Sequence, residues 1–293
     1  MQKLFLIFLA PMLSIMTCHG DVDKLTAPAS DLGHVDLVVD SNAFHSILQD
    51  SFLRNEFAVL YQDTTMYSKP SYDIYLLGQE AFLHISLAKE YWDNKAGSGV
   101  MIFQSRKPGK DDSLYNAWKQ FYPDSLLHKT FKGGDFDLGE ILPYRKKDTT
   151  RPASPGFTPI LTSYSEQAYK NWGFNDSMIV NGVSMKSFMH SWDTTAQQRL
   201  FKKIKALHVQ VTDQEFKEMK SALETMGYQF ANDHFMHTDN PVIYFSIIQN
   251  NKAIRYQKIE IELSSVAPER IIHLGNTYTI RIKDSLMNIT QMK

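Results

Sequence analysis

One order of strand and helix patterns occurs twice in this chain, near its beginning and near its end. The first copy has helical spacing over 41–57, between strand patterns at 33–40, 58–67, 72–78 and 81–87. The second copy begins with the alternating stretch ALHVQV (206–211), continues with helical spacing and ends in further strand patterns. The chain therefore predicts strand–helix–strand–strand–strand units related by an internal repeat.

Residues typical of helix ends mark the limits of both expected helices. In the second copy Thr212 and Glu215 have the spacing of a capping box, and Gly227 follows the last apolar position of the helix. In the first copy Asp40 or Ser41 is placed to cap the helix that follows GHVDLVVD. The helix of each copy is thus expected to begin directly after its opening strand.

The middle of the chain predicts a further unit with less regular spacing. It opens with a strand pattern at 97–105, has helical spacing at 111–122 and closes near 157–169, but its Gly- and Pro-rich interior leaves two strands unplaced. Residues 171–202 predict a helical or irregular connection. The chain ends in an expected edge hairpin at 270–282 that turns at Gly275–Asn276.

Composition excludes some classes of partner. The chain has a net charge of −1 and is 43% hydrophobic, so a folded core is expected and no basic excess favours nucleic acid as a partner.

The N-terminus predicts export to the periplasm, the cell surface or the medium. An apolar run from Leu4 to Met16 has the length of a signal-peptide core, and Cys18, the single cysteine, follows it. Two alternatives stay open for residues 1–20: a lipoprotein signal that ends before Cys18, or an ordinary secretory signal cleaved near Gly20. Lipidation of Cys18 would be the chain's contact with a membrane. Residues 21–31 read as a linker, and a single cysteine excludes an intramolecular disulfide.

The repeated order and the stretches HVDLVVD and FLRNEF resemble the glyoxalase-like, or vicinal oxygen chelate, superfamily, and more narrowly a bacterial glyoxalase-like family of unassigned function. The resemblance implies an α+β fold of βαβββ modules whose mixed sheets curl around a cavity. It places a module pair at 32–170, a connecting segment at 171–202 and a third related unit, with its edge hairpin, at 203–293. Modules of this kind pair within or between chains, so a homodimer stays open.

The same resemblance implies a divalent metal such as Fe, Mn, Ni or Zn. Its members carry a histidine on the opening strand of a module, which His34 matches, and a glutamate on the last strand, where His84 is the nearest candidate. In the paired module the closing stretch ILTSYSEQ (160–167) offers Glu166. Asp36 shares the face of His34 and is expected to orient its imidazole. The alternative is that these residues form an ordinary polar strand face that binds no metal.

The third unit offers further polar side chains for a cavity. His208 alternates with apolar neighbours, and Glu260 and Glu262 share one face of their strand. These side chains either line a cavity or face solvent. When the two helices are aligned, His208 falls on Asp36 and Ala206 on His34, so this unit lacks the opening histidine.

Two functions from different classes stay open. The first is a small-molecule site in the sheet cavity, assisted by a divalent metal held by His34 and His84. The second is a non-catalytic binding or structural protein of the cell envelope that kept the fold and lost the metal. The pattern does not decide whether the chain is an enzyme, because the ligand set that the resemblance implies is incomplete.

Overall fold

The computed structural model describes residues 29–66, 70–88, 96–109, 112–122, 129–133, 135–144, 159–249 and 256–292. The expected signal peptide, Cys18 and most of the expected linker lie outside these residues. In the part of the chain that is described, no helix has both the length and the apolar character needed to cross a membrane.

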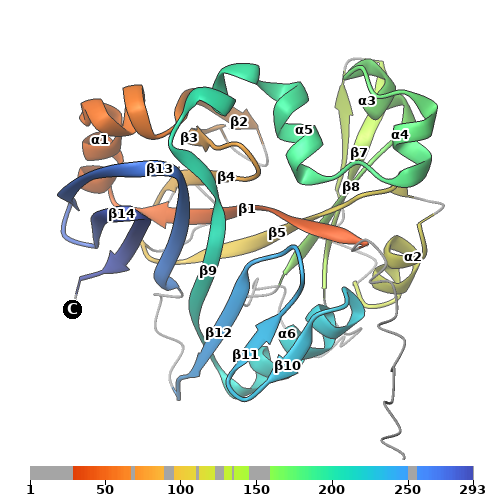
Figure 1. Ribbon diagram of the computed structural model, residues 1–293. Helices are drawn as coiled ribbons and strands as arrows, with labels where there is room; N and C mark the ends of the chain where they lie inside the picture. The colour runs from red at the N-terminus through yellow and green to blue at the C-terminus, as the bar shows by residue number, and fades with distance from the viewer. Residues whose placement is uncertain are drawn as a thin grey trace, which may run out of the picture.

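The first two units share one mixed sheet. Their elements are β1 (Ser30–Val39), α1 (Ser41–Gln49), the π-helical turn η1 (Leu53–Phe57), β2 (Val59–Met66), β3 (Pro70–Leu77), β4 (Phe82–Leu87), β5 (Gly99–Ser105), α2 (Ser113–Lys119), β6 (Lys129–Gly133), β7 (Phe136–Pro143) and β8 (Ile160–Tyr164). The eight strands follow the order β2-β3-β4-β1-β5-β8-β7-β6. In both units the opening strand pairs in parallel with the last, and the two opening strands pair antiparallel at the centre of Figure 1. The order predicted from the sequence pattern is confirmed in the first unit, and in the second unit β6 and β7 are the strands that the pattern left unplaced.

The third unit builds the second sheet. It comprises β9 (Phe201–Val211), α6 (Asp213–Thr225), β10 (Gln229–Ala231), β11 (His234–Met236), β12 (Val242–Ile247), β13 (Tyr256–Leu274) and β14 (Tyr278–Gln291), in the strand order β10-β11-β12-β9-β13-β14. Again the opening strand, here β9, pairs in parallel with the third strand after the helix, which is β12. β13 pairs antiparallel with β9, as β5 does with β1. In the third unit, β13 therefore occupies the edge of the opening strand that, in the first unit, pairs with the opening strand of the second unit.

The structure corrects the expected strands of the third unit. The patterns at 258–265 and 270–274 belong to one 19-residue strand, β13, with shifts in its pairing near Ala267. The predicted turn at Gly275–Asn276 is confirmed, because β13 ends at Leu274 and β14 begins at Tyr278.

The expectation of curled sheets around a cavity was wrong: the described strands form open sheets, and β2 and β6 are the two edges of the larger one. The connection contains α3 (Glu166–Asn171), α4 (Asp176–Asn181), α5 (Met185–Trp192) and the 3₁₀ turn η3 (Thr194–Gln198), as its pattern predicts. Leu77 and Phe82 on the sheet pack against Met185, Phe188 and Met189 of α5. Helices thus cover part of the sheet face that would otherwise enclose a cavity.

Local signals in the sequence explain both long helices. The carboxylate of Asp40 accepts a hydrogen bond from the backbone N–H of Ala43 at 2.9 Å, which settles the cap of α1. Thr212 and Glu215 form the predicted capping box at the start of α6. The apolar face of β1, including Val35 and Leu37, shares one core with buried residues of α1 and of the second sheet. The polar face of β1 is therefore turned away from that core.

The β13–β14 hairpin docks on the first unit. The hydroxyl of Thr277 donates a hydrogen bond to Asp40 Oδ2 at 2.5 Å, and the guanidinium of Arg270 lies 4.3 Å from the ring centre of Phe52. Gly275 has φ +55°, and a Cβ there would lie 2.7 Å from the backbone nitrogen of Ala43. The turn needs glycine for its backbone conformation and for this close approach.

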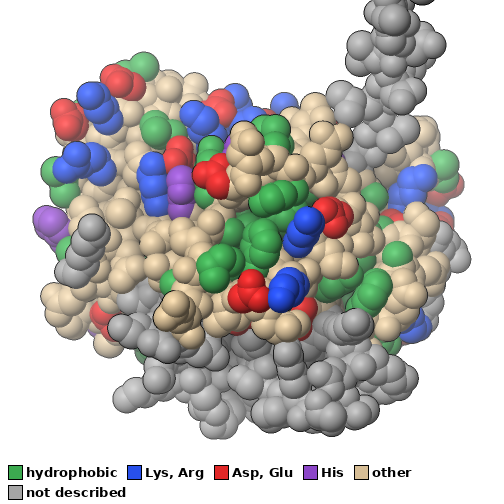
Figure 2. All heavy atoms as spheres, turned by 90° about the horizontal axis from the view of Figure 1, so that it is seen from below, with side chains coloured by type: hydrophobic (Ala, Val, Ile, Leu, Met, Phe, Trp, Pro, Cys, Tyr) green, Lys and Arg blue, Asp and Glu red, His purple; other side chains and the backbone are tan. Residues whose placement is uncertain are grey.

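The surface below the two sheets carries side chains of several kinds. Figure 2 shows hydrophobic side chains near the centre of this face, with acidic and basic side chains beside them. In the third unit Phe230 and Met236 are among the exposed large hydrophobic residues. Charges of both signs are interspersed among the side chains drawn in colour, so they do not form a single-sign surface.

Candidate functional site

Three side chains from two neighbouring strands meet on the polar face of the larger sheet. β1 and β4 run in parallel, with His34 opposite Phe82 and Asp36 opposite His84. Because residues two apart on a strand share a face, His34, Asp36 and His84 lie on one side. One ligand atom from each lies within 4.8 Å of the others. Sequence analysis named all three residues, His34 and His84 as ligands and Asp36 as the partner of His34, and the structure places them side by side.

Asp36 is the centre of the group. Its Oδ1 lies 2.8 Å from Nδ1 of His84 and 3.2 Å from Nε2 of His34. The side chains of Asp36 and His84 are almost fully buried, whereas that of His34 is 20% exposed. A carboxylate shared by two imidazoles therefore sits below the surface, and His34 is the member that reaches solvent.

The second ring nitrogen of His84 faces another buried carboxylate. Its Nε2 lies 3.4 Å from Asp73 Oδ1, and the hydroxyl of Ser86 donates a hydrogen bond to the same oxygen at 2.7 Å. Tyr75 stacks on the His84 ring with 4.6 Å between ring centres. These contacts fix the position and orientation of the imidazole.

His34 is held by stacking. Its ring lies parallel to that of Phe82, with 4.1 Å between centres and an angle of 17°. Phe82 in turn meets the edge of Trp192 at the end of α5. The connecting segment therefore supports the partly exposed histidine.

Burial and the carboxylates together set the charge of the group. Burial opposes the imidazolium of His84, but the charge and hydrogen bond of Asp36, joined by Asp73, outweigh it and raise the pKa of His84 to about 9. Burial also opposes the Asp36 carboxylate, but the two histidines prevail and lower its pKa. For His34 burial prevails and lowers the pKa. Near neutral pH the metal-free group is thus an imidazolium of His84, a carboxylate of Asp36 and a neutral His34.

The donor set fits a divalent metal. Two imidazole nitrogens and one carboxylate oxygen suit Fe, Mn, Ni or Zn and leave further coordination positions open. Binding would require His84 to lose its Nδ1 proton, while the contact of Nε2 with Asp73 favours the tautomer that carries its proton there. The residues present can therefore hold such an ion.

The structure does not bring Glu166 to this group. The expected closing strand ends at Tyr164, and Glu166 begins α3, where its carboxylate pairs with Lys170 at 2.6 Å. Ser165 interrupts the strand because its side chain caps this helix through the backbone N–H of Ala168. The side chain of Glu166 is 59% exposed, and its ion pair with Lys170 lies along the surface of α3.

The residues expected in the third unit form a separate polar group. His208 Nε2 lies 3.0 Å from Glu260 Oε1, which also contacts Lys258 Nζ at 2.5 Å. Glu262 instead pairs with Lys202 at 2.6 Å. His208 and Glu260 are thus brought together, as one alternative from the sequence had it, whereas Glu262 has a different partner.

The strand registers explain why one unit carries the group. In the second unit Ile102 lies opposite Ile160 and Gln104 opposite Thr162, in the places of the ligand-bearing positions of the first unit. In the third unit the equivalent pairs are Ala206 with Val242, and His208 with Tyr244. The lack of the opening histidine in the third unit, predicted by alignment, is confirmed.

Sequence analysis missed Asp73, Tyr75 and Ser86. Asp73 and Ser86 are fully buried, and both contact His84. The signal was present: Asp73 and Tyr75 alternate with Ile74 and Leu76 on β3, the strand that pairs with β4. A buried carboxylate on a neighbouring strand indicates a partner for a buried histidine.

Comparisons with known proteins place the chain in a family. Residues 32–290 match a family described as a family of unknown function (DUF5829). The chain belongs to this family. A comparison with curated proteins finds no match.

Two solved structures are similar to this member of the family. A hypothetical protein from Staphylococcus aureus has a TM-score of 0.51 at 10% identity, covering 84% of this chain and 96% of that chain. A putative dioxygenase from Bacillus subtilis subsp. subtilis str. 168 has a TM-score of 0.30 at 11% identity, covering 90% and 86%. The first likeness shows a related fold, and the second is too low to establish one.

Proposed function

We propose that this protein binds a divalent metal ion through His34, Asp36 and His84 and presents it to a small molecule. The observation that carries the proposal is the convergence of three ligand atoms within 4.8 Å on one buried sheet face. When bound, an ion in such a site polarises a carbonyl or activates water. This gives the polar face of β1 a chemical role.

Each residue of the group has its own task in this proposal. His34 and His84 supply nitrogen ligands and Asp36 supplies an oxygen ligand. Asp73 holds the second nitrogen of His84, and Phe82 keeps the ring of His34 in one plane. The 20% exposure of the His34 side chain provides the side from which a small molecule reaches the site.

The proposal extends to a distant relationship with the glyoxalase-like superfamily. It is supported by the pairing in the three units, in each of which the opening strand lies parallel to the third strand after the helix. Among the described residues the first unit alone carries the complete group, so the relationship concerns architecture and leaves the reaction open.

Metal analysis tests this function. The protein is purified without chelators, and its content of Fe, Mn, Ni and Zn is measured beside that of His34→Ala. We expect close to one ion per chain in the unaltered protein and a large loss in the variant. His208→Ala is the matched control, because His208 also pairs with a carboxylate and stacks on a tyrosine. Equal metal content in all three proteins, or none in any, would contradict the proposal.

A second candidate is a binding protein of the cell envelope that carries no metal. It is favoured by the position of His84 between Asp36 and Asp73, where each ring nitrogen already faces a carboxylate. In that case the group is a buried ion pair that stabilises the sheet. This candidate would be favoured if the protein contains no metal and binds a small molecule equally well before and after His34→Ala.

Export is part of both candidates. We infer it from the apolar run before Cys18 in the sequence. Mass spectrometry of the mature N-terminus from fractionated cells tests it. A lipid-modified Cys18 or an N-terminus near residue 21 supports export, whereas an intact Met1 in the cytoplasmic fraction contradicts it.

A further inference from the structure

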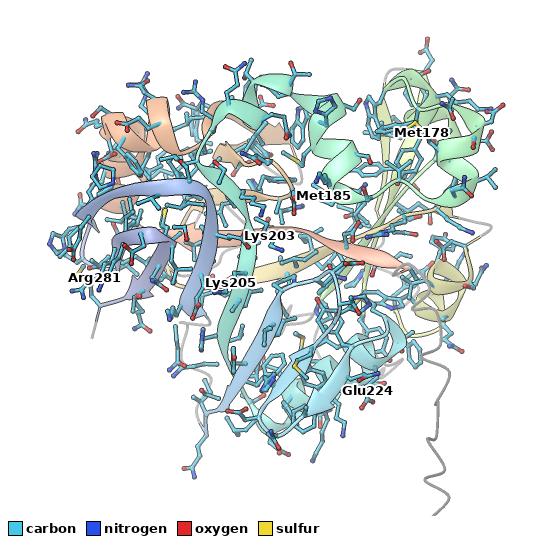
Figure 3. All side chains as sticks on the ribbon, viewed as in Figure 1. Met178, Met185, Lys203, Lys205, Glu224 and Arg281 are labelled. Carbon is cyan, nitrogen blue, oxygen red and sulfur yellow. The ribbon has the colours of Figure 1, made fainter. Side chains whose placement is uncertain are left out.

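A cavity of about 330 Å³ lies where the two sheets and the connecting segment meet. Its walls come from the start of β1, the start of α5, the middle of β9 and the segment Thr238–Pro241. Figure 3 shows Met185 and Lys203, which both line it, close together between α5 and β9. A cavity of this size holds a small organic molecule. The residues of the metal group are not among its lining residues.

One wall of the cavity is fixed by a buried ion pair. Arg106 donates from Nε to Asp31 Oδ2 at 2.9 Å and from Nη2 to Asp31 Oδ1 at 2.6 Å. The backbone N–H of Met185 also donates to Asp31 Oδ2 at 2.7 Å. This bidentate pair ties the first residue of α5 to β1, and its charges satisfy each other.

The segment Thr238–Pro241 is fixed to β1 as well. The side-chain amide of Asn240 accepts a hydrogen bond from the backbone N–H of Leu32 at 2.8 Å and donates one to the carbonyl of Ser30 at 3.1 Å. Asp239, which precedes Asn240 and lines the cavity, is thereby held in place next to β1. Both walls are thus built without any ligand.

Two opposite charges on these walls, Lys203 and Asp239, do not pair with each other. Lys186 pairs with Glu80 at 3.5 Å, but the nearest carboxylate to Lys203 Nζ is Glu262, at 3.8 Å, whose other oxygen binds Lys202. Within the described residues, the Asp239 carboxylate makes no ion pair within 4.0 Å, with Lys203 or with any other cation. The lining of the cavity thus contains an ammonium group and a carboxylate group that form no ion pair with each other.

We propose that this cavity binds a small zwitterion of the size of an amino acid or a dipeptide. The carboxylate of the ligand pairs with Lys203, and its ammonium group pairs with Asp239. A ligand that carries both charges can pair with both groups, and the paired Asp31 and Arg106 contribute shape rather than net charge. This inference goes beyond the metal proposal and does not require an ion at His34.

Binding of matched probes tests the proposal. Calorimetric titration uses alanine and alanylalanine as zwitterions, N-acetylalanine as a probe without an ammonium group and alaninamide as a probe without a carboxylate. We expect saturable binding of at least one zwitterion and at least about tenfold weaker binding of both single-charge probes. Failure of every probe to bind, or equal affinity for all of them, overturns the proposal.

Variants assign the two contacts. Lys203→Met is expected to weaken zwitterion binding at least about tenfold while leaving alaninamide unaffected, and Asp239→Asn to do the same while sparing N-acetylalanine. The matched controls are Lys205→Met, an exposed lysine on the same strand, and Asp233→Asn, an exposed aspartate near the same segment. Unchanged binding in both cavity variants would overturn the assignment. His34→Ala should bind the zwitterions as tightly as the unaltered protein does. A failure of the metal proposal can therefore be told apart from a failure of this one.

Discussion

Asp36 and His84 form a buried ion pair across two parallel strands, with 2.8 Å between Oδ1 and Nδ1. The two residues are direct neighbours in the strand register, which places their side chains on the same face. A buried charge is costly unless it is paired, so each residue of this pair depends on the other. The pair therefore governs both the stability of the first unit and the chemistry of the site.

Replacing Asp36 with asparagine should destabilise the protein strongly. The variant keeps the size of the side chain but leaves His84 with a weaker partner in a buried position. The free energy of unfolding should fall by about 3–5 kcal/mol, as for other broken buried pairs. Urea denaturation measures this loss.

The control for this variant is Glu262→Gln, which alters a partly exposed pair with Lys202. Exposed pairs contribute little, so its midpoint should stay close to that of the unaltered protein. A small effect of Asp36→Asn, equal to that of the control, would show that the buried pair does not stabilise the sheet.

The stability of the metal-free protein should depend on pH through His84. Its pKa is raised from 6.5 to about 9 in the folded state, chiefly by Asp36 acting against burial. The imidazolium therefore stabilises the fold fully below pH 6.5, and this contribution is lost as the pH rises through 9. The loss amounts to about 3 kcal/mol.

Thermal unfolding between pH 6 and 10, with a chelator present, measures this dependence. His84→Gln is the comparison, because it lacks the titrating group and should show a flatter profile over the same window. A profile of the unaltered protein that is as flat as that of the variant would mean that His84 does not gain its proton in the folded state.

Gly99 should not tolerate a side chain. A Cβ at this position would lie 2.0 Å from the backbone oxygen of Asp36 and 2.8 Å from the ring of Tyr256. Gly99→Ala should therefore force β1 and β5 apart beside the site and lower the unfolding temperature by several degrees. Gly33→Ala is the matched control on the paired strand, because its Cβ would meet no atom closer than 3.5 Å. Equal melting of the two variants would contradict this reading of the strand contact.

Arg106→Met should loosen α5 from β1. The variant leaves Asp31 with the backbone N–H of Met185 and without its bidentate partner. We expect a loss of about 2 kcal/mol in the free energy of unfolding and faster cleavage of the connecting segment by a protease. Lys170→Met, which removes a lysine paired at the surface with Glu166, should leave both measurements unchanged. The role of Arg106 is contradicted if the two variants behave alike.

Much of the architecture was predictable from local patterns. The alternation in 33–40 and 206–211 gave the two opening strands, and the spacing of Thr212 and Glu215 gave the start of α6. The open shape of the sheets was not predictable in this way, because it depends on which strands from distant parts of the chain pair with each other. The length of β13 was missed because its interior is polar and its pairing shifts near Ala267.

The candidate site was predictable in part. Strand alternation placed His34 and Asp36 on one face, and the resemblance singled out His84. Asp73 was missed because its contact with His84 depends on the register between β3 and β4, which the sequence does not specify. The sequence prediction extended the strand to Glu166 because this residue follows closely on an apolar run. In the structure Ser165 ends that strand by capping α3.

Anomalous diffraction from crystals soaked in Mn or Zn tests the central claim most directly. The account predicts one strong peak about 2.0–2.2 Å from Nε2 of His34, a carboxylate oxygen of Asp36 and Nδ1 of His84. The same crystals of His34→Ala should lose that peak. A map without a peak among these three residues, with the His84 imidazole still hydrogen-bonded to Asp36, would contradict it.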